Sequence, residues 1–138
     1  MKLTPAVIRR LETAARRAAS HAYSPYSKFP VGSAVLTTSG KIYSGCNVEN
    51  ASFGLCNCAE RTAIFTAVAA GDQKIEAIAI YTATQQATAP CGACRQVLNE
   101  FGATALVFSS CDGPHRIETS MPELLPSAFG PEDLGRTS

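Results

Sequence analysis

The sequence predicts an α/β protein, a three-layer α/β/α sandwich around a mixed five-stranded sheet. Three observations predict this class. Apolar runs of strand length alternate along the chain with segments of helical periodicity. Two strand–helix–strand units indicate parallel pairs with right-handed crossovers. The last two strands are separated only by a short CDGPH turn, which permits an antiparallel pair but not a parallel one.

The first helix and a strand hairpin are expected near the N-terminus. Thr4 followed by Pro5 is typical of a helix start, with Thr as N-cap and Pro at the first helical position. Apolar residues then mark one face of this helix: Val7, Ile8, Leu11, Ala14, Ala15 and Ala18. After a loop at Ala22–Pro30, the strands Val31–Thr37 and Lys41–Asn47 are joined by a Ser-Gly turn, which predicts an antiparallel hairpin.

Helices and strands alternate along the rest of the chain. Three further helices are expected, the first two ended by a glycine: Ala59–Ala70, Cys91–Phe101 and Met121–Leu125. Three further strands are expected: Ile75–Thr82, Ala105–Ser109 and Arg116–Thr119. The tail from Pro126 is expected to be largely irregular. In such sheets the loops at the carboxyl ends of parallel strands, and the helix starts after them, are the usual functional site.

Composition limits the classes of protein that this chain can be. A length of 138 residues predicts one domain, 1–138, and 46% hydrophobic against 17% charged residues argues against disorder. The net charge of +1 gives no general attraction for nucleic acid. There is no signal-peptide run and no window near the roughly 20 apolar residues of a membrane span. We therefore expect a cytoplasmic protein without membrane attachment, whose six cysteines are thiols or metal ligands.

Two of the expected helix starts carry cysteines. One reads C-A-E at 58–60, and the other reads P-C-G-A-C at 90–94. Cys91 and Cys94 are three apart on one helical face, so both sulfurs can reach a single ion, and Cys58 comes from the neighbouring helix start. Three thiolates with an open fourth position are typical of catalytic zinc, which lowers the pKa of a bound water toward about 7. Helix N-termini also favour thiolate.

Two charged residues follow Cys58 directly. Glu60 lies beside the expected metal without being a ligand, so it can take a proton from water and deliver it to a substrate. Three thiolates on divalent zinc leave a net charge of −1. The guanidinium of Arg61 could bond the sulfurs and offset that charge.

Each motif alone has a plainer interpretation. A lone C-x-x-C is more often half of a structural zinc site or a redox pair, and a first-turn Glu usually only complements the helix dipole. Arg61 could be a solvated helix residue. Cys46, Cys56 and Cys111 are most simply buried small hydrophobic residues, although Cys56 could close the metal site as a fourth ligand. The conjunction of the two cysteine motifs with a strand between them is far more specific than either motif.

Together these motifs resemble the cytidine deaminase family, specifically its small homotetrameric type, which pairs such cysteines with a glutamate that carries protons. The resemblance covers nearly the whole chain, from Ala22 to Leu134. The matching stretches are YSPYSKFPVG (23–32), GCNVENA (45–51), CAERTAI (58–64), PCGACRQVL (90–98) and ELLPSAFGPEDL (123–134).

The resemblance implies a metal, a proton carrier and a shared site. One Zn²⁺ per chain and its proton shuttle would use four residues: Cys58, Cys91, Cys94 and Glu60. Ala51 and Phe129 match positions that reach into a neighbouring subunit's site, so a homotetramer is implied. Phe53 departs from the family, where Tyr is common at that position, and a hydroxyl contact near the shared site is then missing.

The resemblance also implies how a nucleoside is held. Asn47 and Glu49 would hold the ribose hydroxyls, although without the family both are simply turn residues. Phe29 would pack on the pyrimidine, and its plainer interpretation is a core Phe. The backbones of Ala59 and Ala89 would face the carbonyl and amino groups of the base. Ala89 replaces the usual Ser or Thr, which a backbone contact tolerates.

The expected function is zinc-dependent hydrolytic deamination of cytidine and 2′-deoxycytidine to the uridine products, with release of ammonia. One alternative is a deaminase of another nucleoside, a nucleoside antibiotic or a base within RNA or DNA. A second alternative is a structural zinc module with Cys56 as fourth ligand, and a third is a thiol–disulfide protein using Cys91 and Cys94. The N-V-E-N segment favours a free nucleoside, because its side chains would engage hydroxyls that a polymer has esterified.

Overall fold

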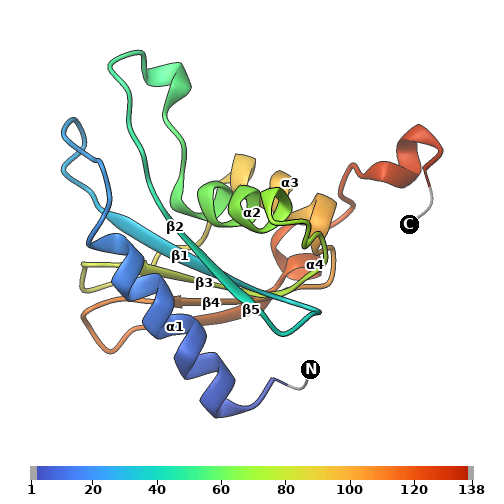
Figure 1. Cartoon of the computed structure of the whole chain (residues 1–138), viewed down its shortest axis with the longest axis horizontal. Helices are drawn as coiled ribbons and strands as arrows, with labels where there is room; N and C mark the ends of the chain where they lie inside the picture. Colours follow the sequence, from blue (N-terminus) through green and yellow to red (C-terminus); the bar gives the residue numbers. More distant parts are fainter. Residues whose placement is uncertain (1–2, 137–138) are drawn as a thin grey trace.

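A five-stranded sheet forms the centre of the computed structural model, which describes residues 3–136 (Figure 1). The strand order is β2-β1-β3-β4-β5. The strands are β1 (Val31–Thr37), β2 (Ile42–Cys46), β3 (Ile75–Thr82), β4 (Leu106–Ser110) and β5 (Ile117–Ser120). β3 and β4 pair in parallel, and β4 and β5 pair antiparallel. The predicted mixed five-stranded sheet is therefore confirmed, including its antiparallel last pair.

One predicted strand pairing is wrong. The first strand–helix–strand unit does not place its two strands side by side, because β1 lies between β2 and β3 and pairs antiparallel with both. The burial of the strands explains this order. β1 is buried at six of its seven positions, whereas β2 is mostly half-buried or exposed. The more apolar strand of the hairpin therefore takes the inner position, and the helix after β2 crosses over β1 to reach β3.

Helices cover both faces of the sheet, as the three-layer prediction requires (Figure 1). The helices are α1 (Pro5–Ala19), α2 (Ala59–Ala69), α3 (Gly92–Phe101) and α4 (Met121–Leu124). Leu11 and Ala15 of α1 pack on one face of the sheet. Ile64 of α2 and Leu98 of α3 pack on the other. The predicted N-cap of α1 is confirmed, because Thr4 Oγ1 accepts a hydrogen bond from the Val7 N–H at 3.2 Å.

The central strand β3 joins the two apolar layers. Its alternate residues Ile78 and Ile80 point to the α2 and α3 side, while Ala77, Ala79 and Tyr81 belong to the α1 side. Such a strand is buried on both faces, which explains its nearly continuous apolar sequence. The carboxyl end of β3 therefore has a rigid position from which the chain runs into α3.

Two short 3₁₀ helices were not predicted. They are η1 (Phe53–Leu55), in the loop before α2, and η2 (Pro131–Leu134), in the tail that was expected to be largely irregular. η2 begins with a proline that suits the first helical position, and the Gly130 N–H donates to Asp133 Oδ2 at 2.9 Å. Among residues 3–136, no helix combines the length and apolar character needed to cross a membrane.

Helix α1 lies close against the sheet at a glycine. A Cβ built on Gly32 of β1 would lie 1.8 Å from the carbonyl oxygen of Ala15. Gly32→Ala is therefore expected to lower the free energy of unfolding by about 3 kcal/mol, because backbone cannot move aside as a flexible side chain can. Urea denaturation measures this loss. Gly54→Ala is the control, since a Cβ at Gly54 meets nothing within 4 Å, and equal stability of the two variants would contradict the close contact.

Candidate metal centre and adjoining pocket

The three predicted metal ligands come from the starts of two neighbouring helices. Cys58 is the N-cap of α2 and Cys91 is the N-cap of α3, both with extended backbone, and Cys94 follows one turn into α3. Neither N-cap side chain makes a capping hydrogen bond within the described residues, so neither sulfur is used to cap its helix and both are available to an ion. The partial positive charge of two helix N-termini stabilises thiolates at this point.

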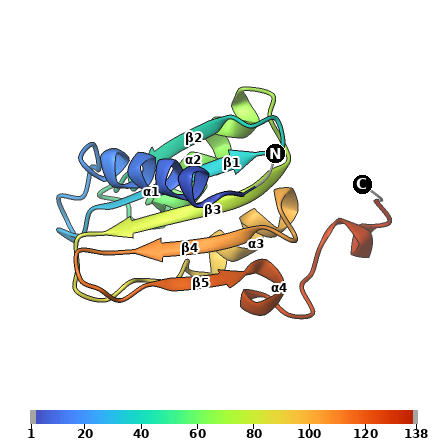
Figure 2. The same cartoon turned by 90° about the horizontal axis from the view of Figure 1, so that it is seen from below.

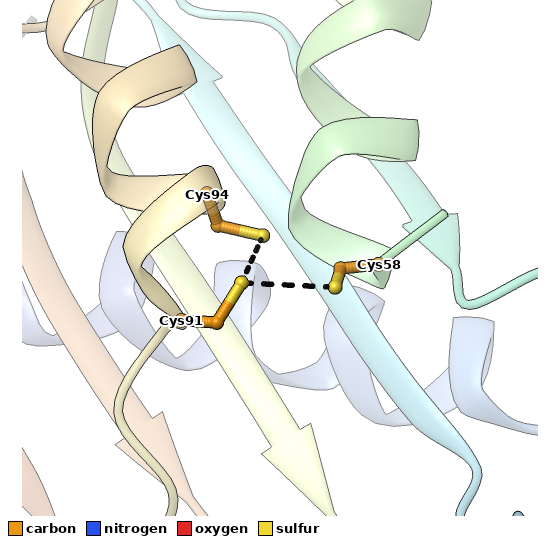
Figure 3. Close-up of side chains that lie close together, drawn as sticks. All are labelled: Cys58, Cys91 and Cys94. Atoms are coloured by element: carbon orange, nitrogen blue, oxygen red, sulfur yellow. Dashed lines mark hydrogen bonds between the residues drawn. The ribbon is translucent and has the colours of Figure 1, made fainter. Parts of the chain in front are cut away.

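The sulfur atoms have the spacing that a zinc ion requires (Figure 3). The Sγ atoms of Cys58 and Cys91 are 3.8 Å apart, and those of Cys91 and Cys94 are 3.5 Å apart. All three sulfurs lie within 4.8 Å of one another. A tetrahedron with Zn–S bonds of about 2.3 Å has edges of roughly 3.8 Å. The donor set and its spacing therefore fit zinc.

Arg61 lies where it can stabilise the thiolates. Its Nη2 donates to the Sγ of Cys58 at 3.1 Å. The neighbouring Cys94 thiol and then this guanidinium lower the pKa of Cys58, while contact with Cys58 and burial raise the pKa of Cys94. The Arg61 Nε is buried without a hydrogen-bond partner among residues 3–136. The guanidinium therefore retains a hydrogen-bond donor beyond its contact with Cys58.

Loss of this guanidinium is expected to weaken the metal centre. Arg61→Gln should lower zinc affinity or turnover by roughly 10–100-fold, because an outer hydrogen-bond partner and its compensating charge are removed. Zinc retention against a chelator and the rate of turnover are the measurements. Arg17→Gln, at an exposed position in the last turn of α1, is the control. Unchanged zinc retention together with an unchanged rate in Arg61→Gln would reject the role.

Glu60 is a buried carboxyl in the first turn of α2. Only 6% of the residue is exposed, and this burial raises the pKa of Glu60 to about 7. A hydrogen bond from the Glu60 backbone N–H partly offsets the rise, and the negative charge of Cys58 adds to it. A carboxyl with such a pKa exchanges protons near neutral pH. Glu60 and two of the cysteines, Cys58 and Cys91, line one cavity.

This cavity has the size of a small-molecule site. Its volume is about 390 Å³, within the range of ligand pockets. Its walls include five residues that the sequence analysis singled out for a nucleoside: Phe29, Asn47, Glu49, Ala59 and Ala89. Phe29 is 40% exposed, so it is not the ordinary core residue of the plainer interpretation.

Asn47 and Glu49 also hold the loop that carries Phe29. Asn47 accepts from the Val31 N–H at 2.9 Å and donates to the Phe29 carbonyl at 2.8 Å. Glu49 Oε1 accepts from the N–H groups of Tyr26 and Ser27 at 3.0 and 3.1 Å, and its Oε2 accepts from the Ser27 hydroxyl. These bonds lower the pKa of Glu49, the Ser27 hydroxyl most of all.

Two of the implied residues do not line this cavity. Ala51 is exposed in the loop before η1, and Phe129 is 59% exposed in the C-terminal segment, where it lines a separate cavity against α3. Sequence reasoning in turn missed other wall residues: Ser27, Val31, Ile80, Thr82 and Thr88. The position of Thr82 at the carboxyl end of β3 was the available signal.

The remaining cysteines lie outside the metal cluster. Cys56 Sγ contacts the backbone N–H and carbonyl of Asn50 at 3.3 and 3.6 Å. Cys111 is buried and donates to the His115 carbonyl at 3.2 Å. Cys46 is half-buried, and burial raises the pKa of its thiol. All six cysteines are free thiols.

Known proteins match this chain over the same region. The family model described as cytidine and deoxycytidylate deaminase zinc-binding region matches residues 6–110, which include all three clustered cysteines and Glu60. The chain belongs to the cytidine and deoxycytidylate deaminase family. The resemblance inferred from the sequence is thereby confirmed, and the zinc-binding region of this deaminase family, together with the cysteine cluster, identifies zinc as the cofactor.

Individual deaminases are similar in sequence and in structure. The cytidine deaminase of Sporosarcina psychrophila is 45% identical over 129 residues, which cover 92% of this chain and 94% of that protein. The crystal structure of the cytidine deaminase from Burkholderia pseudomallei is similar with a TM-score of 0.85 and 49% identity, covering 92% of this chain and all of that chain. The Mycobacterium tuberculosis enzyme has a TM-score of 0.77 and 39% identity, covering 89% and 97%.

Proposed function

We propose that this deaminase-family chain hydrolyses cytidine and 2′-deoxycytidine to uridine and 2′-deoxyuridine with release of ammonia. One observation carries the proposal. A buried carboxyl, Glu60, lines the same cavity as Cys58 and Cys91, two of the three thiols that have the spacing of a zinc site. The cluster would supply three ligands to zinc, and a catalytic zinc site keeps its fourth position for water.

The chemistry depends on proton transfer by Glu60. When bound, zinc supplies a Lewis acid that lowers the pKa of water. The Glu60 carboxylate takes a proton from the attacking water and delivers it to N3 of the cytosine ring, which makes C4 more electrophilic. Glu60 then takes the remaining proton of the hydroxyl now bonded to C4 and gives it to the amino group, which leaves as ammonia while the C4 carbonyl forms. A pKa of about 7 allows the same carboxyl to accept and release a proton in each cycle.

The pocket residues retain hydrogen-bonding capacity for a ribose. Glu49 has about four lone-pair sites, of which three accept from Tyr26 and Ser27. Asn47 donates one amide hydrogen to the Phe29 carbonyl, and the other has no acceptor among residues 3–136. One acceptor and one donor therefore remain for the two hydroxyls of a nucleoside, and the exposed face of Phe29 suits stacking on the base.

An absorbance assay tests the reaction. Purified protein is mixed with cytidine, and the long-wavelength edge of the cytosine band is followed over time, with and without a zinc chelator. Chelator-sensitive loss of this band is expected. No change in protein with zinc bound would reject cytidine as the substrate, and a panel of amino-bearing nucleosides, antibiotics and single-stranded oligonucleotides would then test the alternatives.

We also propose that the enzyme is a homotetramer whose subunits share active sites. Ala51 and Phe129 are exposed and do not line the cavity of their own chain, although the family pattern assigns both to a site. Exposed Phe53, Leu55 and Leu134 add apolar surface that an interface would cover. Light scattering should give the mass of four chains, and a monomer would reject the proposal.

A cytoplasmic location completes the proposal. All six cysteines are free thiols, which is the state that a reducing compartment maintains. Thiolate ligands require this state, because a disulfide between clustered cysteines would prevent zinc binding. Fractionation of cells with antibody detection should find the protein with cytoplasmic markers, and recovery with an exported fraction would reject this location.

A further inference from the structure

Part of the pocket wall lies on a loop without regular secondary structure. Thr88 and Ala89 line the cavity, and they belong to residues 83–91, which connect β3 to α3. The rest of the loop must therefore be held by bonds to other segments if the wall is to keep its place.

Two side chains bond this loop on either side of the wall. Before it, the N–H of Ala87 donates to Nδ1 of His115 at 2.9 Å. After it, Nε of Arg95 donates to the carbonyl of Pro90 at 2.8 Å. Because Ala87 supplies the hydrogen, Nδ1 of His115 is the acceptor in this bond.

The turn that carries His115 fits closely against the same loop. This turn joins β4 to β5 at the end of the sheet where β3 enters the loop (Figure 2). The N–H groups of Asp112 and Gly113 lie 2.9 and 3.4 Å from the Thr84 carbonyl. A Cβ at Gly113 would lie 2.4 Å from the Gln85 carbonyl oxygen, so only glycine permits this approach.

A buried thiol further orders the turn. Cys111 Sγ contacts the carbonyls of Gly113 and His115 at 3.5 and 3.2 Å. The backbone of His115 is thus held from inside the turn, while its ring reaches the loop. The imidazole holds the loop at the residue that directly precedes the wall, since Ala87 comes before Thr88.

We propose that His115 is a positioning residue for substrate binding, which holds the Thr88–Ala89 wall of the pocket through the Ala87 N–H. The proposal rests on the proposed function, because that wall is useful only if a substrate occupies the cavity. Without this bond the loop is more mobile, so substrate binding must order it. The entropy lost in that ordering weakens binding and raises KM. Glu60 and Cys58 lie at the start of α2, and Cys91, at the end of the loop, is the N-cap of α3 and follows the Pro90 carbonyl that Arg95 holds, so kcat is spared.

Two substitutions separate the hydrogen bond from the bulk of the ring. His115→Leu removes the acceptor, and we expect KM for cytidine to rise roughly three- to tenfold with kcat within about twofold. His115→Asn places an amide oxygen near the position of Nδ1, so its KM should return close to that of the unaltered enzyme. His21→Leu is the control, because the only other histidine in the sequence is exposed after α1 and does not line the pocket.

A measurement without substrate keeps this test independent of the reaction. Amide hydrogen exchange of the peptide spanning residues 83–91 should be faster in His115→Leu and restored in His115→Asn, with other peptides unchanged. Unchanged exchange in His115→Leu, or unchanged KM despite faster exchange, would overturn the positioning role. Equal defects in the Leu and Asn variants would overturn it as well. An inactive unaltered enzyme with zinc bound would instead reject the proposed function.

Discussion

Glu60→Gln should lose at least about 100-fold, and up to about 10⁴-fold, in kcat while its zinc stays bound, because the variant cannot move protons. Glutamine has nearly the shape of glutamic acid, so the buried position at the start of α2 should remain filled. It lacks, however, a group that takes up and releases a proton near neutral pH. Steady-state kinetics with cytidine and a zinc determination on the same sample measure both parts of this result.

A control variant must show that the loss of kcat is specific to Glu60 and does not follow from replacing a glutamate elsewhere in the chain. Glu76→Gln, on β3 and outside the cavity, makes the same substitution and should leave kcat unaltered. Near-normal turnover of Glu60→Gln with zinc bound would contradict proton transfer by Glu60. Loss of zinc in that variant would show that Glu60 supports the metal instead.

Cys94→Ala is expected to abolish stoichiometric zinc and with it the activity. Cys94 is only 1% exposed, and its sulfur is one of the three in the cluster. Removal of a ligand should weaken zinc binding by more than the roughly 10–100-fold that loss of an outer partner costs. Alanine is the best helix former, so α3 itself should persist. Zinc content after dialysis, read together with circular dichroism, separates metal loss from unfolding.

The matched control for this prediction is Cys56→Ala. Cys56 precedes Cys58 by two residues, yet its sulfur bonds the backbone of Asn50 and lies outside the cluster. Cys56→Ala should therefore keep one zinc per chain and full activity. Zinc loss in Cys56→Ala would indicate a fourth sulfur ligand, a closed site and a structural role for the metal.

Local sequence signals are enough to predict the cluster of three cysteines. The C-A-E and P-C-x-x-C motifs sit at helix starts, where caps and helix dipoles act over a single turn, and the structure brings their sulfurs together as expected. The N-cap at Thr4 and the extent of β3 are also predictable from the sequence, because both depend on residues that are neighbours in the chain. The η2 turn was missed, since Pro131 was grouped with an irregular tail.

Contacts between segments that are distant in the sequence cannot be predicted from local signals. The sequence order of the hairpin does not reveal that β1 lies between β2 and β3, because burial of the whole sheet selects the inner strand. From the sequence, Asn47 and Glu49 are expected only to contact a ribose or to lie in a turn. In the structure they also hold the loop of Phe29 through bonds across some twenty residues of chain.

The chain's own residues therefore settle the chemistry that is available here: three thiols, a carboxyl and a guanidinium at two helix starts, within a pattern of alternating strands and helices. Tertiary packing determines the pKa of the carboxyl and the position of the pocket wall. Burial between the helices and the sheet raises the pKa of Glu60 to about 7. The turn between β4 and β5 brings His115 against the loop that carries Ala87. Desolvation and contacts between distant segments arise only when the sheet and its helices enclose them, which is why tertiary structure is needed to establish them.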